Sequence, residues 1–515
     1  MEDAEAITAE EMAALDENCG YFGLIPLQLM ENAGAQLAAE IRKRFPNGGK
    51  NRAGEAVNVT VLAGKGNNGG DAFVAARQLN GFAVTVLLLG RATDLRTDEA
   101  RRNWRILQES DTTTAEITDS SQLQAAAADV LDATVLVDGI FGTGIKGAIR
   151  EPEATAIELI NTARPRAFVV AVDVPSGLDP TTGEADSAVT ADLTVTFHRP
   201  KTGLLETRAE PYVGELVVAD IGIPKRFERL AGPGDVRLLL KRSPRTHKGD
   251  NGRVLIVGGG PFSGAPTLAA LAALRAGADW VTVAAPRSVS GIIASFSPNL
   301  IVHPLSAAVV VEKDVIPIVD LVKKHDSVAI GMGLGAADET KEAVQQIIEH
   351  EATKKLIVDA DGFYGLALPN TAEDRRIIVT PHAGEFAKMR VNAHGRDMAV
   401  PPEDKLEARM EFVTAFSQRN NVVTLMKGPV DIVSDGNRVK LNRTGNAGMT
   451  VGGTGDVLAG LAAAFFAVTG DPFKAATAAA FVNGTAGDLA FATKGSSLLA
   501  TDVLEAIPSV TKQFT

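Results

Sequence analysis

Apolar residues form short runs along the first half of the chain, and longer segments with helical spacing lie between these runs. Helical spacing is clearest from Leu27 to Ala38 and from Ala72 to Leu79. The runs that we interpret as strands are residues 57–63, 84–89, 135–138 and 168–173. Buried apolar runs that alternate with helices are typical of a parallel sheet covered on both faces. The pattern therefore predicts an α/β domain.

The second half repeats this alternation. Its predicted strands are residues 254–257, 281–284, 327–330, 356–359, 377–380 and 422–426. Each run ends beside Gly, Asp, Pro or Lys, as expected at the carboxyl edge of a parallel sheet, where ligands bind. Gly-Pro-Gly at 232–234 is the strongest linker signal between the two halves. We predict an α/β protein with one domain at residues 1–225, a linker at 226–235 and a second domain at 236–515.

Composition narrows the class of protein. A chain of 515 residues with 45% hydrophobic and 22% charged residues is too long for one core and too apolar to be disordered. A net charge of −12 without a long basic run argues against nucleic-acid binding. Cys19 is the only cysteine, which excludes an internal disulfide and a cysteine-based zinc site. The acidic N-terminus lacks the features of a signal peptide, and the apolar run 457–468 is too short to span a bilayer. We therefore expect a cytoplasmic protein that binds neither membranes nor nucleic acid.

A glycine-rich stretch precedes that apolar run, from Asn446 through Gly-Gly-Thr-Gly-Asp at 452–456 to Gly460. Glycines before a helix let its free N–H groups approach an anion, which the helix dipole also favours. Asp456 is unfavourable there unless it meets a proton, a metal or a reacting hydroxyl. A phosphate loop with one carboxylate suits phosphoryl transfer to an alcohol, and the chain has no Walker-type P-loop to serve instead. The alternative is an ordinary helix start with an Asp near its N-cap.

The first half has its own glycine-rich loop. Residues 64–69 fit G-x-G-x-x-G between a strand and a helix, but the acidic residue expected about 20 positions later is missing. Asn68, Asp138 and Ser176 instead follow predicted strands and offer the oxygen atoms that a cation requires. Residues 141–147 offer backbone N–H groups for a phosphate, with Lys146 as the counter-charge. The alternative is that these residues only form tight loops.

Five motifs in the first half, at 29–34, 66–71, 138–144, 174–177 and 220–224, together resemble the NAD(P)H-hydrate epimerase domain over residues 5–225. The resemblance implies a Rossmann-like three-layer αβα sandwich, a potassium ion held by Asn68, Asp138 and Ser176, and Asp173 or Lys146 as the acid/base. The residues implied to contact the hydrated nucleotide are Asn67, Asn68, Gly69, Gly70, Asp71, Gly142, Thr143, Gly144, Ile145, Lys146, Gly147, Ala148 and Asp173.

In the second half, His382 and Lys427 follow predicted strands. A structural histidine and a solvated surface lysine are the simpler interpretations of these two residues. However, the motifs at 247–249, 258–265, 331–335, 359–361, 380–385, 427–429 and 452–456 resemble the ADP-dependent NAD(P)H-hydrate dehydratases of the ribokinase-like superfamily over residues 236–512. Met332 is a departure, because proline is common there in the family.

The second resemblance implies a ribokinase-like αβα domain with two neighbouring subsites. Ala265, Gly335, His382 and Asp456 would line the hydrated-nucleotide subsite. Lys427, Gly428, Pro429, Val430, Asp431 and Gly455 would bind ADP, which we expect to carry Mg²⁺.

Both resemblances on one chain imply a bifunctional repair enzyme, an isomerase and a lyase. It would interconvert the R and S forms of hydrated NADH and NADPH, and would dehydrate the S form at the expense of ADP, giving AMP and phosphate. Asp456 would act as general base on the C6 hydroxyl. The family also implies a homo-oligomer. The alternative function is a small-molecule kinase, acting on a vitamin or sugar alcohol, with a non-catalytic nucleotide-sensing first domain.

Overall fold

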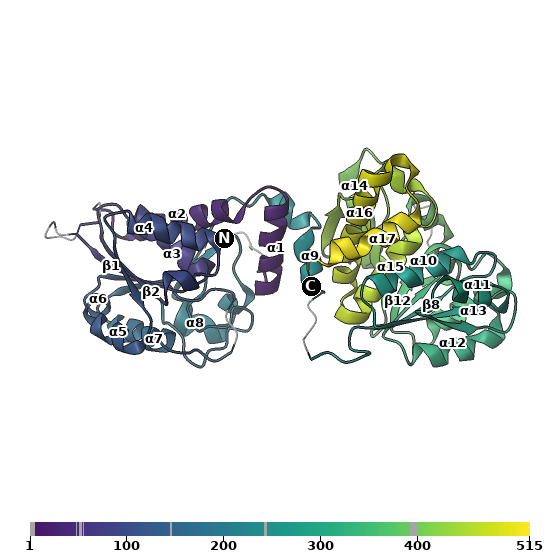
Figure 1. The fold of residues 1–515 in the computed structure, drawn as a ribbon, viewed down its shortest axis with the longest axis horizontal. Coiled ribbons are helices and arrows are strands. Elements are labelled where there is room, and N and C mark those ends of the chain that lie inside the picture. The colour runs from purple at the N-terminus through teal and green to yellow at the C-terminus, as the bar shows by residue number, and fades with distance from the viewer. Residues whose placement is uncertain are drawn as a thin grey trace. The chain divides into compact units, whose positions relative to one another are not determined.

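The computed structural model of the chain describes residues 6–47, 49–50, 54, 56–144, 147–240, 245–391 and 399–514. The chain divides into two units, Met1–Phe227 and Glu228–Thr515. Each unit contains its own sheet with helices on both faces, which confirms the predicted two-domain α/β class (Figure 1).

The sheet of the first unit has seven parallel strands among the described residues, in the order β3-β2-β1-β4-β5-β6-β7. The strands are β1 Asn58–Ala63, β2 Ala83–Leu89, β3 Thr113–Ile117, β4 Val135–Gly139, β5 Phe168–Val172, β6 Leu193–Phe197 and β7 Glu215–Ala219. The strand order reverses between β1 and β4. Ligands of doubly wound sheets bind at the carboxyl ends of the strands on either side of such a reversal.

Helices cover both faces of this sheet (Figure 1). One apolar cluster joins the sheet to α1 Ala9–Tyr21, α2 Pro26–Arg44, α3 Asn67–Gln78 and α4 Asp98–Gln108. A second cluster joins the other face to α5 Ser120–Ala125, α6 Ala127–Leu131 and α7 Glu153–Ala163, and α8 Glu210–Val213 precedes β7. The unit is therefore the predicted αβα sandwich.

Helix α3 begins five residues earlier than the sequence indicated, at Asn67 rather than Ala72. The glycines of this segment suggested a loop, because glycine disfavours helix interiors. Gly69 in fact lies in the first turn of α3, where a Cβ would be 2.0 Å from the carbonyl oxygen of Gly64. The glycine therefore allows the helix to start directly against the end of β1. As a result, Asn68 lies on a helix, and Asp138 lies inside β4 rather than after it.

The sheet of the second unit has nine strands among the described residues, in the order β10-β9-β8-β11-β12-β14-β16-β17-β18. The strands are β8 Arg253–Val257, β9 Trp280–Ala285, β10 Leu300–Pro304, β11 Ser327–Ile330, β12 Lys355–Val358, β14 Arg376–Val379, β16 Val423–Met426, β17 Asp431–Ser434 and β18 Val439–Asn442. β17 and β18 are antiparallel to their neighbours and the other strands are parallel. β13 Ala367–Leu368 and β15 Arg390–Val391 form a separate short ladder. The sequence predicted six strands of the large sheet and missed β10, β17 and β18.

The helices of the second unit are α9 Pro233–Arg237, α10 Gly264–Arg275, α11 Arg287–Phe296, α12 Val315–Val322, α13 Asp338–Glu349, α14 Leu406–Asn420, α15 Thr454–Thr469, α16 Pro472–Lys494 and α17 Ala500–Thr511. α15 is the buried helix that the apolar run predicted. It packs so closely on α10 that a Cβ at Gly460 would lie 2.0 Å from the carbonyl oxygen of Ala269. Among the described residues, no helix is both long and apolar enough to cross a membrane.

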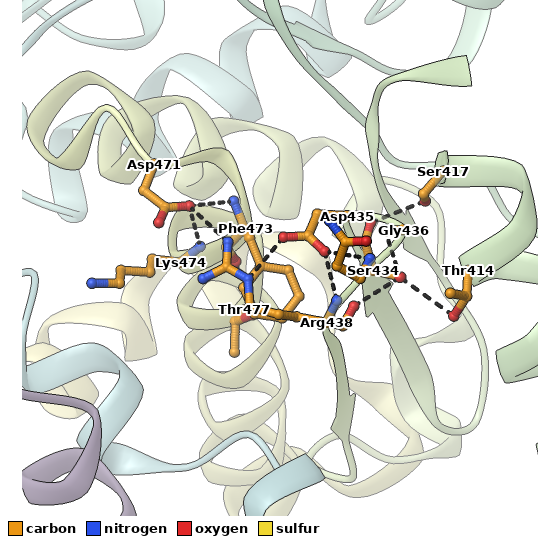
Figure 2. A network of polar contacts seen from close by, with 11 residues as sticks. Thr414, Ser417, Ser434, Asp435, Gly436, Arg438, Asp471, Phe473, Lys474 and Thr477 are labelled. Carbon is orange, nitrogen blue, oxygen red and sulfur yellow. Dashed lines mark hydrogen bonds and ion pairs between the residues drawn. The ribbon is translucent and has the colours of Figure 1, made fainter. Parts of the chain in front are cut away.

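The β17–β18 hairpin is fixed to the N-terminus of α16 (Figure 2). The Arg438 guanidinium pairs with Asp435 at 2.8 Å and lies 4.3 Å from the centre of the Phe473 ring. Asp471 caps α16 by accepting hydrogen bonds from the N–H groups of Phe473 and Lys474. These contacts hold the antiparallel edge of the sheet against the start of α16.

Candidate active sites

In the first unit, Asp138 lies near the end of β4 and is fully buried. Its carboxylate accepts hydrogen bonds from the Ser176 backbone N–H at 2.8 Å, from the Ser176 hydroxyl at 2.5 Å and from the Ile140 N–H at 3.3 Å. Burial raises the pKa of Asp138 to about 6, and the hydrogen bonds from Ser176 and Ile140 oppose this rise. A buried carboxylate of this kind favours a nearby cation.

Asn68 brings further oxygen atoms to the same place. Its amide Nδ2 donates to the Phe141 carbonyl at 2.9 Å, and a Cβ at Gly142 would lie 3.0 Å from its Oδ1. The Phe141 carbonyl also lies 3.3 Å from the Ser176 hydroxyl. Amide, carbonyl, hydroxyl and carboxylate oxygens are the donors that hard cations prefer, so the residues fit a potassium ion. The structure thus brings the three predicted ligands, Asn68, Asp138 and Ser176, together.

Asp173 directly follows β5 and has a left-handed backbone, with φ at +64°. Its Oδ1 accepts hydrogen bonds from Lys201 Nζ at 2.5 Å, from the Thr196 hydroxyl at 3.0 Å and from the Phe197 N–H at 3.4 Å. Lys201 is 0% exposed. Its ammonium also donates to the Thr196 hydroxyl at 3.1 Å and to the Phe197 carbonyl at 3.0 Å. Three acceptors therefore match its three hydrogens.

Two further acids interact with this pair. Burial raises the pKa of Asp71, in α3, well above its usual value. The negative charges of Asp173 and Asp16 add to this rise, and the positive charge of Lys201 opposes it. Asp16, in α1, is open to water, yet surrounding protein atoms and the charge of Asp173 raise its pKa to about 7, against Lys201. Carboxyl groups with separated pKa values can supply an acid and a base to one reaction.

The loop after β4 supplies the other predicted contacts of this unit. Gly142 lies beside Asn68 and is followed by Thr143 and Gly144; Gly147, with φ at +81°, and Ala148 are described after a gap. Ile145 and Lys146 lie outside the described residues.

In the second unit, β12, β14 and β16 are neighbours, and their carboxyl ends bring three charged residues together. Lys427 Nζ lies 2.9 Å from Asp359 Oδ1 and 3.5 Å from Glu385 Oε2. The side chains of the two acids are 3% and 7% exposed, against 20% for Lys427. Burial opposes the charged form of Lys427, but Asp359 and Glu385 outweigh it and raise the pKa of the ammonium.

The first turn of α15 faces Lys427. Gly453 is its N-cap, with φ at +103°, and a Cβ at Gly455 would lie 3.4 Å from Lys427 Nζ. Within the described part of the chain, the N–H groups of residues 454–456 donate to no protein acceptor. Free N–H groups at a helix N-terminus beside an ammonium form an anion site.

Asp456 lies in this same turn and is half-buried. Burial and then the charge of Asp359 raise its pKa to about 7, Lys427 opposes the rise, and Asp361 and Glu385 add to it. A carboxylate that titrates near neutrality is suited to general base catalysis.

His382, Ala265 and Gly335 lie at the same edge of the sheet. The His382 Nδ1 accepts from the Gly384 N–H at 3.0 Å, and its ring is 59% exposed. Because Nδ1 accepts, Nε2 carries the proton of the neutral ring and can donate it to a ligand. The Gly335 N–H donates to Asp361 at 2.9 Å.

The loop that carries Gly335 rests on the start of α10. A Cβ at Gly333 would lie 3.3 Å from that of Ala265. The carbonyl of buried Met332 accepts from the Gly259 N–H at 2.9 Å. A proline would keep this carbonyl, so the departure at Met332 preserves its backbone role.

The turn from Lys427 to Asp431 joins β16 to β17, and Gly428 and Pro429 are exposed at its tip. Asp431 accepts hydrogen bonds from the Gly428 N–H and from Asn442 Nδ2, both at 3.0 Å. Burial raises its pKa to about 6. The Asp431 carboxylate therefore shapes the turn and leaves the exposed backbone groups of Gly428 and Pro429 at its tip.

Two family models match the chain in the order of these sites: "YjeF-related protein N-terminus" over residues 26–203 and "NAD(P)H-hydrate dehydratase" over residues 254–509. The bifunctional NAD(P)H-hydrate repair enzyme of Archaeoglobus fulgidus is 44% identical over 504 residues, which are 98% of each chain. The enzyme of the same name from Pyrobaculum aerophilum is 43% identical over 99% of each chain. The chain belongs to the bifunctional NAD(P)H-hydrate repair enzymes.

Among solved structures, the ADP/ATP-dependent NAD(P)H-hydrate dehydratase of Bacillus subtilis, co-crystallised with ATP and Mg²⁺, aligns with a TM-score of 0.46 at 24% identity. It covers 55% of this chain and 98% of that chain. The family relationship agrees with the repair function expected from both sequence motif sets. It gives no support to the alternative, a vitamin or sugar-alcohol kinase with a nucleotide-sensing first domain.

Sequence reasoning about this repair enzyme assigned no role to four residues that the structure places at the sites. Asp359 and Glu385 stand inside motifs that suggested the family. Lys201 follows β6, whose alternating Leu-Thr-Val-Thr-Phe pattern is a strand signal that marks Lys201 as a strand-end residue. Asp16 has no local signal, since its position depends on how α1 packs.

Proposed function

We propose that the first unit interconverts the R and S forms of hydrated NADH and NADPH, and that the second unit dehydrates the S form with ADP as phosphoryl donor. The observation that carries the proposal is Asp456, a carboxyl with a pKa of about 7 in the first turn of α15, beside the Lys427 ammonium. The names of the full-length relatives support the substrate.

In the second unit, Asp456 takes the proton of the C6 hydroxyl as that oxygen attacks the β-phosphorus of ADP. The bond from this phosphorus to the bridging oxygen breaks, and AMP leaves. The free N–H groups of α15 and the Lys427 ammonium stabilise the charge on the transferring phosphoryl group. The N1 electron pair then expels phosphate from C6, and loss of a C5 proton restores the dihydropyridine. Phosphorylation is useful here because phosphate is a far better leaving group than hydroxide.

The same site contains the carboxyl groups of Asp359, Asp361, Glu385 and Asp456 against one ammonium. Such an excess of negative charge repels a free nucleoside diphosphate. ADP is therefore expected to enter with Mg²⁺.

In the first unit, Asp173 is the acid/base and Asn68, Asp138 and Ser176 would hold potassium. That ion would supply a fixed positive charge for the anionic nucleotide. Lys146 stays the alternative acid/base. The cytoplasmic location and the homo-oligomer also stay predictions.

The test is to incubate the purified chain with mixed R and S hydrates of NADH and to follow the return of reduced-nicotinamide absorbance, with ADP or ATP. Full recovery of both forms is expected with ADP, and Asp456→Asn should abolish it. If the S form is recovered quickly but the R form only at the rate of spontaneous epimerisation, the epimerase assignment is contradicted. No recovery with either nucleotide would refute the dehydratase assignment.

A further inference from the structure

Lys201 has features that a structural lysine does not require. Its side chain is wholly buried, and removing an ammonium from water costs several kcal/mol unless the geometry compensates. A structural ion pair at this place would be replaceable by apolar side chains without loss. The compensation that Lys201 finds is Oδ1 of Asp173, together with Thr196 and the Phe197 carbonyl.

Among the described residues, the hydrogen bonds of Asp173 reach only one of its two carboxylate oxygens. Its hydrogen bonds within the described residues all reach Oδ1, so Oδ2 is left for another partner. Asp173 also has φ at +64°, a conformation that a residue other than glycine adopts at a cost and that persists only where its surroundings impose it. The left-handed backbone of Asp173 and the three hydrogen bonds to its Oδ1 together fix the direction in which Oδ2 points.

Lys201 is itself held by a distant part of the chain. Its backbone forms a parallel bridge with Ile7, and the Ile7 N–H donates to the Pro200 carbonyl at 2.9 Å. Ile7 leads into α1, which carries Asp16. The ammonium therefore cannot swing toward a substrate without breaking its three hydrogen bonds, so any effect on the reaction passes through Asp173.

We infer that Lys201 is the positioning residue of the epimerisation site: its buried ammonium holds Oδ1 of Asp173 so that Oδ2 faces the reacting C6 of the hydrated nicotinamide. This inference rests on the epimerase function proposed above. Lys201 touches Asp173 and not the substrate.

The chemistry requires a base with a fixed direction. In epimerisation by loss and return of water, the C6–O bond breaks, the oxygen takes a proton from an acid and leaves as water, and the N1 electron pair forms a C=N bond. Water then adds to the opposite face of C6 and gives its proton to Asp173 Oδ2. One water leaves and one enters, and no electron is gained or lost. The neighbouring Asp71, whose pKa is well above its usual value, is a source for the first proton.

The experiment compares full-length Lys201→Met, Lys201→Arg and Arg164→Met. Arg164 pairs with Asp192 at 3.0 Å at the amino end of β6, away from Asp173, so it is a solvent-accessible ion-pair control on the same unit. Conversion of the R hydrate to the S hydrate is measured by chromatography on each full-length variant, without ADP, so that the second unit does not consume the S form. Lys201→Met is expected to lower the epimerase kcat about 100-fold, the lower end of what a general base contributes, while KM changes little. Arg164→Met should match the wild type.

The pH profile separates positioning from a structural role. In Lys201→Met the acid limb of kcat/KM should move to higher pH, because a carboxylate that loses an adjacent ammonium takes up a proton more readily. Lys201→Arg keeps the charge and should restore the position of that limb. An unchanged kcat and an unchanged limb in Lys201→Met would overturn the inference.

Folding of the first unit is followed through Trp104 in a Trp280→Phe background, since each unit contains one of the two tryptophans. If Lys201→Met fails to fold, the variant Thr196→Val tests the positioning role instead. It keeps the side-chain shape but removes one donor to Asp173 and one acceptor of Lys201. A kcat about tenfold lower, which corresponds to about 1.4 kcal/mol of transition-state stabilisation lost with these two hydrogen bonds, supports the inference, and a wild-type kcat refutes it. A wild-type chain without epimerase activity would refute the proposed function instead.

Discussion

Replacing Lys427 by methionine tests whether the buried charges of the second unit are coupled as the geometry indicates. Lys427 lies 2.9 Å from Asp359 and 3.5 Å from Glu385, and both acids are almost fully buried. Methionine keeps the length of the side chain and removes its charge. Two buried carboxylates then face each other without a cation, and removing one member of a buried pair typically costs about 3–5 kcal/mol. The pKa of Lys427 is raised in the folded state, so this stabilisation is present at every pH below its unfolded pKa and is lost only above it.

The assay is chemical unfolding followed through Trp280 in a Trp104→Phe background, so that only the second unit reports. Lys427→Met should lower the free energy of unfolding by about 3–5 kcal/mol. The melting temperature should fall by roughly 6–10 °C, at about 2 °C per kcal/mol for a unit of this size. Lys323→Met is the matched control, because Lys323 pairs with Asp320 at 3.2 Å on the surface and should cost less than about 0.5 kcal/mol.

A triple variant tests whether the loss of stability in Lys427→Met comes from the unpaired carboxylates. Adding Asp359→Asn and Glu385→Gln to Lys427→Met removes the two stranded carboxylates, and the triple variant should recover most of the lost stability. If Lys427→Met is no worse than Lys323→Met, the three side chains are not a coupled buried group and the reasoning fails. If the triple variant is as unstable as the single one, lost packing rather than charge explains the effect.

Three further predictions concern the two sites. The dehydratase kcat/KM should rise with pH to a plateau above about 7, because Asp456 must be ionised to act as base; a profile that is flat through this range would contradict that role. Potassium should raise the melting temperature of the first unit more at about pH 7 than at about pH 5, because Asp138 must ionise to bind the ion. N-methylglucamine chloride without sodium is the ionic-strength control. If potassium raises the melting temperature of Asp138→Asn as much as that of the wild type, this site is excluded. Gly69→Ala should destabilise the first unit by about 2–3 kcal/mol, since its Cβ would meet the Gly64 carbonyl oxygen at 2.0 Å; Gly66→Ala, with open space around it, should cost far less, and equal costs would refute the close-packing argument.

Local sequence rules recovered the features that depend on neighbouring residues. The Thr-x-x-Glu pattern at Thr8 and Glu11 forms a capping box at the start of α1, and the apolar run after Asp456 forms the buried helix α15. Ten of the parallel strands were readable because a strand buried on both faces is a continuous apolar run. β3, β7 and β10 were missed because they are partly exposed, and β6 because threonines interrupt its apolar run. The antiparallel pair β17–β18 was missed because each strand contains only two apolar residues beside polar ones, which is too weak a signal for a strand.

The start of α3 shows where propensity misleads. Asn-Asn-Gly-Gly disfavours a helix locally, yet the helix begins there because the glycines allow it to lie against β1. The identity of Gly69 thus reports a close contact with the backbone of Gly64, five residues earlier at the end of β1, rather than a turn.

The acid cluster of the first unit could not be read from sequence for a different reason. Asp16, Asp71 and Asp173 come from α1, α3 and the end of β5, and Lys201 from the segment that follows β6. The raised pKa values of Asp16 and Asp71 depend on the charges of Asp173 and Lys201, so these shifts arise only once the elements pack. The second unit repeats this logic with a lysine at a strand end, because Lys427 is committed to Asp359 and Glu385 and only partly offsets the rise in the pKa of Asp456. In both units the lysine pairs with carboxylates beside it and leaves another acid with a raised pKa, which is the division of roles that proton transfer at neutral pH requires.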